Sequence, residues 1–338
     1  MPTPRRETAS RAASPTTCVA HTRAYSDGVL SEQGFDVDRI SELLDAPDTV
    51  VWLDLLQPSA ADLEVLVDEL GLHPLAVEDA LHAHQRPKLD HYTDHLFLAA
   101  YAVVVEDGEV ETAEVAAFLT PRALVTVRKD PRVELEPVLA RWDAAPHLTG
   151  SGVAYLAHGL VDVLVDGYVA VTQELDDVSD EIEDLLFAGP GERVLQERTF
   201  ALRSSVTRLR RVVLPMQEVI ALMRRPDLGL VDPEVEPYLR DVDDHVQRVL
   251  AAVEAIREQL ATILDTTIAL QGQRLNETLF RLTAWAAILA VTTAITGFFG
   301  QNIPYPGIEQ TSGFLASTVL LVASVGGLYV YFKRKGWL

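Results

Sequence analysis

The pattern of hydrophobic and polar residues divides the chain into a long soluble part and a short C-terminal part suited to a membrane. Two stretches near the end carry no charged residue, one between Arg281 and Gln301 and the other between Glu309 and Lys333. Each is long enough to cross the hydrocarbon core of a bilayer, which takes about 20 apolar residues in a helix. The sequence therefore predicts a large soluble domain followed by two membrane helices.

The first soluble region, residues 18–132, has the alternating signals of a mixed α/β domain. Runs rich in β-branched and aromatic residues indicate strands at 50–55, 96–105, 115–120 and 123–128. A helix is expected from Ala60 to Leu70, with Ser59 as its N-cap. Pro121-Arg122 is expected to form the turn between the last two strands.

The strand signals end at Pro131, and residues 133–230 have the pattern of a helical region. Helical patterns cover 134–143, 152–187 and 191–224, and the sequence Gly-Pro-Gly at 189–191 separates the second from the third. Pro215 is expected to kink the third helix because proline cannot donate to the helical ladder.

A long helix is expected next, with residues 231–281 forming a stalk that continues into the first membrane span. Its apolar residues recur in steps of three and four: Val246, Val249, Val253, Ile256, Leu260 and Ile263, continued by Thr267 and Leu270. This heptad spacing is typical of helices that pack on other helices. Burial within one monomer is the alternative, but the regularity favours self-association. A helix that runs unbroken from about Pro233 into the first span would be roughly 100 Å long at ~1.5 Å per residue, which suits a central bundle in a symmetric oligomer.

The chain of 338 residues carries a formal net charge of −22. This acidity argues against nucleic-acid binding, because no basic stripe is present to neutralise phosphates. It fits a cationic partner, although acidity that simply keeps a protein soluble is the plainer explanation. The single cysteine, Cys18, excludes an internal disulfide framework and is compatible with a reducing cytosol. Residues 1–17 lack the apolar core of a signal peptide, so a disordered tail is expected.

The distribution of basic residues predicts the orientation in the membrane. Lys333-Arg334-Lys335 opens the tail 333–338 after the second span, and Arg274 and Arg281 precede the first span. The loop between the spans has neither lysine nor arginine over residues 303–312. By the positive-inside rule, both termini are expected in the cytoplasm, with the loop 301–312 outside the cell membrane.

The first predicted span, residues 282–300, has one stripe of small side chains and another of mostly bulky ones. The small residues are Thr283, Ala286, Ala287, Ala290, Thr293, Ala294 and Gly297. Such residues let helices approach closely, and the alternative is a narrow pore lined by small and hydroxyl groups. No charge lies inside the span, so no fixed ion site is expected there. A single two-span chain cannot enclose a pore, so a pore would need a ring of copies. The second span is expected at 313–332.

Five motifs along the chain carry a family resemblance. The most telling is Gly300-Gln301-Asn302, which follows an apolar helix and precedes a short loop and a second span. The others are Trp52-Leu53-Asp54-Leu55 with Pro58-Ser59, residues 73–79 (HPLAVED) with 85–88 (QRPK), residues 238–245 (YLRDVDDH), and residues 335–338 (KGWL). Together, and in their order along the chain, these motifs resemble those of the two-transmembrane G-x-N superfamily, whose main members are the CorA magnesium transporters. The resemblance covers nearly the whole chain.

The resemblance implies a funnel-shaped homopentameric cation channel, with an α/β cytoplasmic domain, a long helical stalk and two C-terminal transmembrane helices in each copy. The first span would line the pore, and the second would lie outside it. The residues implied in the ion pathway are Asn276 as an inner polar ring, Leu279 and Leu282 as a hydrophobic constriction, Ala290, Thr293 and Gly297 in the middle, and Gly300, Gln301 and Asn302 at the mouth.

The resemblance also implies regulation by the transported ion. It brings Asp79 of one copy close to Asp241 of the next, with Glu78 and Asp244 nearby. Facing carboxylates repel unless a cation lies between them, so Mg²⁺ would hold neighbouring domains together. The alternatives are solvated surface charge, or a stabilising effect of Asp241 on the N-terminal end of a helix.

Two departures from the family pattern concern the mouth. Gln301 stands where methionine is commonest, and Pro304-Tyr305-Pro306-Gly307 with Glu309 replaces a Met-Pro-Glu-type stretch. Zinc-transporting members also vary here, so Mg²⁺ is the first expectation and Zn²⁺, Co²⁺ or Ni²⁺ the alternative. Mg²⁺ holds its waters tightly, and a ring of Asn302 amide oxygens would hydrogen-bond those waters. The histidines of the soluble domain are expected at the surface or in ordinary packing: His82, His84, His91 and His95.

The sequence does not predict an enzyme. Gly150-Ser151-Gly152 lacks the third glycine of a dinucleotide-binding turn, and neither Gly-x-Ser-x-Gly nor His-Glu-x-x-His occurs. A membrane-anchored cation sensor without transport is the competing class. The expected partners are divalent cations, the lipid bilayer and further copies of the chain, with Mg²⁺ as substrate and regulatory ligand and no organic cofactor.

Overall fold

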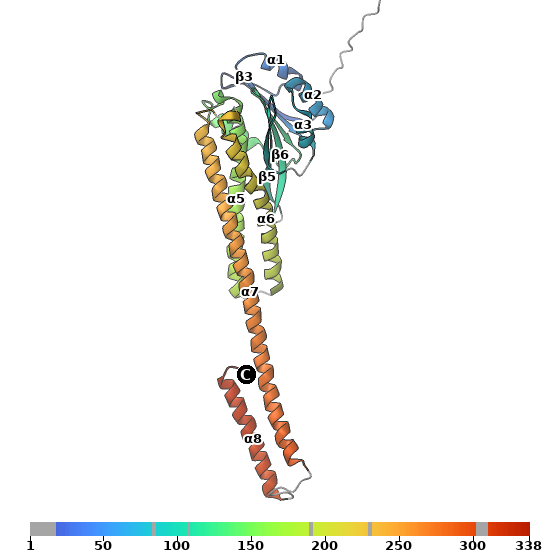
Figure 1. Cartoon of the computed structure of the whole chain (residues 1–338), viewed down its shortest axis with the longest axis vertical. Coiled ribbons are helices and arrows are strands. Elements are labelled where there is room, and N and C mark those ends of the chain that lie inside the picture. The colour runs from blue at the N-terminus through green and yellow to red at the C-terminus, as the bar shows by residue number, and fades with distance from the viewer. Residues whose placement is uncertain (1–17, 83–85, 107, 189–191, 229–231, 302–309) are drawn as a thin grey trace, which may run out of the picture. The chain divides into compact units, whose positions relative to one another are not determined.

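The computed structural model describes residues 18–82, 86–106, 108–188, 192–228, 232–301 and 310–338 (Figure 1). The chain divides into two compact units, residues 1–260 and 261–338. The long helix α7 (Glu236–Phe299) contributes to both units.

The first unit is built on a seven-stranded mixed sheet with the order β2-β1-β3-β7-β6-β5-β4. Four strands confirm the predicted ones: β3 (Thr49–Leu56), β5 (Leu96–Glu106), β6 (Glu109–Leu119) and β7 (Ala123–Arg128). β3 and β7 pair in parallel, and the other neighbouring strands pair antiparallel. The mixed α/β domain predicted from the sequence is therefore present.

Three further strands were not predicted: β1 (Val19–Ser26), β2 (Val29–Gln33) and β4 (Lys88–His91). β2 and β4 are the two edge strands, and β2 is mostly exposed. Strands with this little burial carry no long apolar run, so their composition does not distinguish them from loops.

Helices cover both faces of the central strands. On one face, α1 (Ile40–Leu44), α2 (Ala60–Leu70) and α3 (Pro74–Leu81) pack in a core that includes Phe97 and Ala99 of β5. On the other face, Trp52 meets Trp142 of α4 (Glu136–Ala144) with 5.0 Å between ring centroids. Burial on both sides explains why these strands are largely apolar.

The predicted start of α2 is confirmed. The Ser59 side chain accepts a hydrogen bond from the Asp62 amide, and Asp62 Oδ2 accepts one from the Ser59 amide at 2.8 Å. These bonds form a capping box. Hydrogen bonding from the Ser59 amide and hydroxyl lowers the pKa of Asp62.

The helical region contains α5 (Val153–Ala188) and α6 (Glu192–Met223), close to the predicted ranges. Pro215 lies inside α6, which runs as one helix from Glu192 to Met223. α7 follows as a single helix of 64 residues, so the predicted stalk and first span are one element.

The heptad seam of α7 is buried within the chain itself, which corrects the expectation that this seam mediates self-association. The side chains of Val246, Val249, Val253, Ile256 and Leu260 are at most 3% exposed in the single copy. Hydrogen bonds also link α7 to its neighbouring helices. Arg210 of α6 donates to Glu254 at 2.6 Å, and Gln259 donates to Glu183 of α5 at 2.9 Å. The 3-4 spacing reports helix-on-helix packing correctly but cannot distinguish a helix of the same chain from that of a partner.

The second unit holds the end of α7 and the helix α8 (Thr311–Arg334), which lie side by side in Figure 1. In the described chain, three helices are long and apolar enough to cross a membrane: α5, α7 and α8. The apolar window of α5 is 61% buried inside the protein, against 11% for α7 and 6% for α8. The burial of α5 makes it a core helix of the first unit.

Candidate functional site

The predicted pore-lining residues lie on α7 and are exposed in the single chain: Asn276, Leu279, Leu282, Ala290, Thr293 and Gly297. Leu279 is 50% exposed and Leu282 is 67% exposed. Ala284 and Ile288, on the opposite side of the helix, are buried in a cluster with Phe332 of α8. One face of α7 is therefore used for packing on α8, and the predicted pore face is left uncovered.

Hydroxyl groups along this span are oriented by their own helix. Thr293 Oγ1 donates to the Leu289 carbonyl at 2.8 Å, and Thr296 Oγ1 donates to the Thr292 carbonyl at 3.0 Å. Because the hydroxyl hydrogen is used in these bonds, the oxygen lone pairs remain as acceptors. Such oxygens can accept hydrogen bonds from the water shell of a cation.

The helix ends at the predicted mouth. The Gly300 amide donates to the Thr296 carbonyl at 2.9 Å, and the Gln301 amide donates to the Phe298 carbonyl at 3.3 Å. A Cβ on residue 300 would lie 3.1 Å from the Thr296 oxygen, so glycine allows this tight ending. Gln301 is exposed, whereas Asn302 and residues 303–309 lie outside the described residues.

The end of the chain forms an aromatic clasp that sequence reasoning missed. Trp337 stacks on Phe280 of α7, with 4.8 Å between ring centroids, and on Phe332 of α8, with 5.4 Å. Gly336 has a φ of +74°, its amide donates to the Lys333 carbonyl, and the Trp337 amide donates to the Phe332 carbonyl at 3.0 Å. This is a Schellman ending, which turns Trp337 back onto the hairpin. Phe280 neighbours Leu279, so the clasp lies at the level of the predicted constriction.

The acidic residues predicted to regulate the channel lie on two helices of the first unit. On α3, Glu78 is exposed and Asp79 is half-buried, with Asp79 Oδ2 2.6 Å from Lys88 Nζ. Lys88 also lies 2.6 Å from Asp90 Oδ2. Asp79 therefore has a cationic partner in its own chain, which the sequence did not indicate.

On α7, Asp241 and Asp244 are exposed. Asp241 Oδ2 lies 3.4 Å from Nδ1 of His245, one turn further along the helix. Among the described residues of a single copy, no group of three or more His, Cys, Asp or Glu side chains is arranged to hold a metal. A regulatory ion at these acids would therefore need ligands beyond the described residues of one copy.

His158 of α5 lies in the same region. Burial lowers its pKa to about 4, and the positive charge of Arg141 acts in the same direction, while Asp241 opposes it. The imidazole is thus neutral at pH 7 and places no positive charge beside Asp241.

The other histidines behave as packing or surface groups. His82 and His91 are exposed, and His95 is buried in a ring stack with Tyr92 at 4.9 Å. His84 lies outside the described residues. The positions of His82, His91 and His95 agree with the prediction that these histidines lie at the surface or in ordinary packing.

An α/β unit followed by two helices long and apolar enough to cross a membrane, α7 and α8, has the architecture expected of a membrane protein. The chain belongs to the CorA family, because the family model described as a CorA-like Mg²⁺ transporter protein matches residues 47–334. This membership places it among transporters and not among enzymes.

Comparison with single proteins agrees with the family assignment. The chain is 29% identical over 308 residues to the cobalt/magnesium transport protein CorA of Thermotoga maritima, covering 90% of this chain and 87% of the relative. It is 22% identical to the zinc transport protein ZntB of Pectobacterium carotovorum, covering 85% and 88%. Its fold is similar to the complete CorA magnesium transporter structure from Methanocaldococcus jannaschii, with a TM-score of 0.77, 20% identity, and 94% and 98% of the two chains covered.

Proposed function

We propose that this chain forms a homopentameric channel that admits Mg²⁺ through the cell membrane into the cytoplasm. The observation that carries the proposal is the division of α7 into two faces. One face packs on α8, and the other carries exposed small and hydroxyl side chains that no helix of the described residues covers. A ring of copies that joins these faces encloses a pore, which one copy cannot do.

The chemistry of this face favours a hydrated hard cation. Thr293 offers an oxygen acceptor, and the described part of the span from Leu282 to Gln301 contains no cysteine, methionine or histidine. Mg²⁺ dehydrates reluctantly and is best recognised through its water shell. Zn²⁺, Co²⁺ or Ni²⁺ is the alternative, favoured by Gln301 at the mouth and by the similarity to a zinc transporter.

The test is uptake of Mg²⁺, Zn²⁺ and Co²⁺ into liposomes that contain the purified full-length protein, at several pH values. We expect Mg²⁺ uptake above that of empty liposomes. A preference for Zn²⁺ or Co²⁺ would support the alternative cargo. Cation binding without flux of any of the ions would identify a sensor and refute transport.

Polar substitution of the predicted constriction is expected to increase leak. Leu279 and Leu282, repeated around a ring, would form an apolar neck that stops ions by dewetting. Leu282→Ser should therefore raise Mg²⁺ flux several-fold when internal Mg²⁺ is high, measured in the same liposomes. Leu315→Ser is the matched control, because Leu315 is 61% exposed but lies on α8. Equal flux in the two variants would mean that Leu282 is a lipid-facing residue.

Removal of the Asp241 carboxylate is expected to weaken the protection that Mg²⁺ gives the protein against protease. Mg²⁺ that binds the closed ring more tightly than the open ring stabilises the closed ring. A Mg²⁺ site with only one or two carboxylates binds the ion weakly. Asp79 must also exchange its contact with Lys88 for the ion. Asp241→Ala should need a several-fold higher Mg²⁺ concentration than the wild type for the same resistance to protease.

The control for this experiment is Glu197→Ala, which removes an exposed carboxylate from α6. Its protection should follow the wild type. If Mg²⁺ protects Asp241→Ala as well as it protects the wild type, Asp241 is not part of the sensor.

A further inference from the structure

Helix α6 concentrates positive charge in a strongly acidic protein. Between Glu197 and Glu218 it has no acidic residue but contains five arginines, whereas the whole chain has a net charge of −22. The arginines are Arg198, Arg203, Arg208, Arg210 and Arg211. The net charge of the whole chain hides this local excess of positive charge on α6.

A cavity of about 510 Å³ lies between this helix and the β5–β6 hairpin. Four arginines line it: Arg86, Arg208, Arg210 and Arg211. Thr112 of β6 and the ring of Tyr101 of β5 contribute from the sheet. A smaller hollow of about 310 Å³ shares Arg208 and Arg211 and adds Arg203. All of these residues belong to the first unit.

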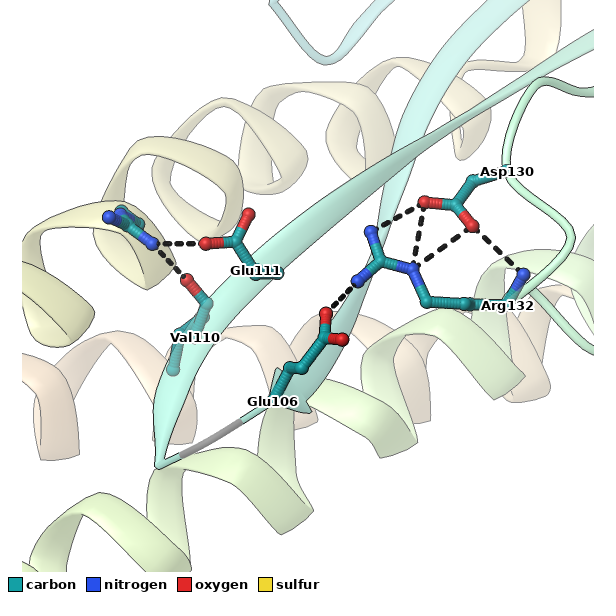
Figure 2. A network of polar contacts seen from close by, with 6 residues as sticks. Glu106, Val110, Glu111, Asp130 and Arg132 are labelled. Carbon is teal, nitrogen blue, oxygen red and sulfur yellow. Dashed lines mark hydrogen bonds and ion pairs between the residues drawn. The ribbon is translucent and has the colours of Figure 1, made fainter.

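Two of the lining arginines have acidic partners that hold them in place. Arg208 donates to Glu111 at 2.5 Å and to the Val110 carbonyl at 3.0 Å, and Figure 2 labels these two acceptors. Arg210 donates to Glu254 at 2.6 Å. These two therefore build the wall of the cavity and are largely neutralised.

The other arginines lack such compensation. Among the described residues, no carboxylate lies within ion-pair distance of Arg86, Arg203 or Arg211. Arg86 comes from the segment before β4, and Arg211 comes from α6, so two separate parts of the fold bring unpaired guanidinium groups to one cavity. Like charges placed together destabilise one another, and an anion between them removes that repulsion.

The shape and lining of the cavity indicate the class of anion. A guanidinium group matches phosphate oxygens with two parallel hydrogen bonds. The volume falls within the usual range of small-molecule sites, roughly 300–1,000 Å³. Leu214 and Pro215 give the cavity an apolar wall, which inorganic phosphate would not use.

We propose that this cavity is a binding site for a phosphate-bearing organic anion of nucleotide size, with Arg86 and Arg211 holding the phosphates. The proposal does not depend on the proposed ion transport. It adds an organic ligand to a protein for which the sequence predicted no organic cofactor.

The test uses the purified full-length protein in detergent, with EDTA present so that removal of Mg²⁺ by the ligand cannot change the result. ATP, pyrophosphate, inorganic phosphate and adenosine are titrated by calorimetry, and the unfolding temperature is followed in parallel. ATP should bind and raise the unfolding temperature with increasing concentration. Pyrophosphate should bind more weakly, inorganic phosphate more weakly still, and adenosine should not bind.

Arg211→Gln and Arg86→Gln are each expected to lower the affinity for ATP at least tenfold. Both side chains are exposed, so the fold should survive the substitutions. The matched control is Arg193→Gln on the same helix, because Arg193 is 90% exposed and pairs with Glu197. Its affinity for ATP should equal that of the wild type.

Four results would overturn the proposal. The first is no ATP binding to the wild type, and the second is equal binding to Arg211→Gln. The third is inorganic phosphate binding as tightly as ATP, which would leave no role for the apolar wall. The fourth is a changed oligomeric state of Arg211→Gln in light scattering without ATP binding by the wild type, which would assign the cavity to contact with a second copy.

Discussion

Replacing Asn302 by alanine is expected to reduce divalent-cation uptake to the background of empty liposomes while the protein still assembles. In the proposed ring, the amide oxygens of this residue would meet at the mouth and accept hydrogen bonds from the waters of Mg²⁺, which the ion releases reluctantly. Alanine removes the acceptor but is compatible with the end of a helix. Uptake is measured in liposomes, and assembly is measured by size-exclusion chromatography with light scattering.

Gln310→Ala provides the matched control for Asn302→Ala. Gln310 is also an amide residue between the two helices, but it is the N-cap of α8, and its side chain accepts from the Ser312 hydroxyl at 3.2 Å. This variant should transport like the wild type. Normal uptake by Asn302→Ala would remove Asn302 from the selectivity site, and loss of uptake in both variants would point to a general requirement of the loop.

Removing the carboxylate of Asp54 is expected to destabilise the first unit by about 3–5 kcal/mol, the range for breaking one partner of a buried ion pair. Asp54 is 0% exposed and Arg128 is 5% exposed. Arg128 Nε donates to both Asp54 oxygens, at 3.1 and 3.2 Å, and the Thr126 hydroxyl donates to Asp54 Oδ1 at 2.8 Å. Asp54→Ala would leave the guanidinium buried without a counter-charge.

The control for Asp54→Ala is Glu106→Ala, which removes an exposed ion pair with Arg132, visible in Figure 2. Exposed pairs contribute little because water screens them, so the unfolding transition should hardly move. Both variants are compared with the wild type by denaturant unfolding followed through tryptophan fluorescence, which Trp52 and Trp142 report from within the first unit. A transition for Asp54→Ala that coincides with that of Glu106→Ala would refute the structural role of the buried pair.

The sequence predicted the parts of the fold whose burial is strongest. β3, β5, β6 and β7 are mostly buried and therefore have largely apolar runs, and the Ser59 cap follows from local hydrogen bonding. The edge strands β2 and β4 were missed because half-exposed residues carry no such signal. Periodicity identified the packing face of α7, but it could not show that the chain buries this face on its own helices.

The candidate site was predicted less completely than the fold. The small residues of the α7 span are exposed as expected, but bulky residues such as Trp285 and Leu289 are exposed as well, so exposure alone does not define the pore face. The contact of Asp79 with Lys88 depends on how α3 meets β4, which no local pattern encodes. Asp54 belongs to a motif that supported the family resemblance, yet its pairing with Arg128 requires the parallel register of β3 and β7. The stacking of Trp337 likewise depends on the Schellman turn at Gly336.

The in-chain burial of the α7 seam has a mechanical consequence for a ring of copies. In the first unit, the uncovered side of α7 carries charged or small residues: Asp244, Arg248, Ala251, Ala255 and Glu258. Subunits that meet along such a surface share a hydrated, polar contact, which resembles a transient interface more than a protein core. The assembly would therefore be stiff within each subunit and compliant between subunits. In the proposed ring, neighbouring copies would then shift relative to one another without exposing the hydrophobic core of either copy.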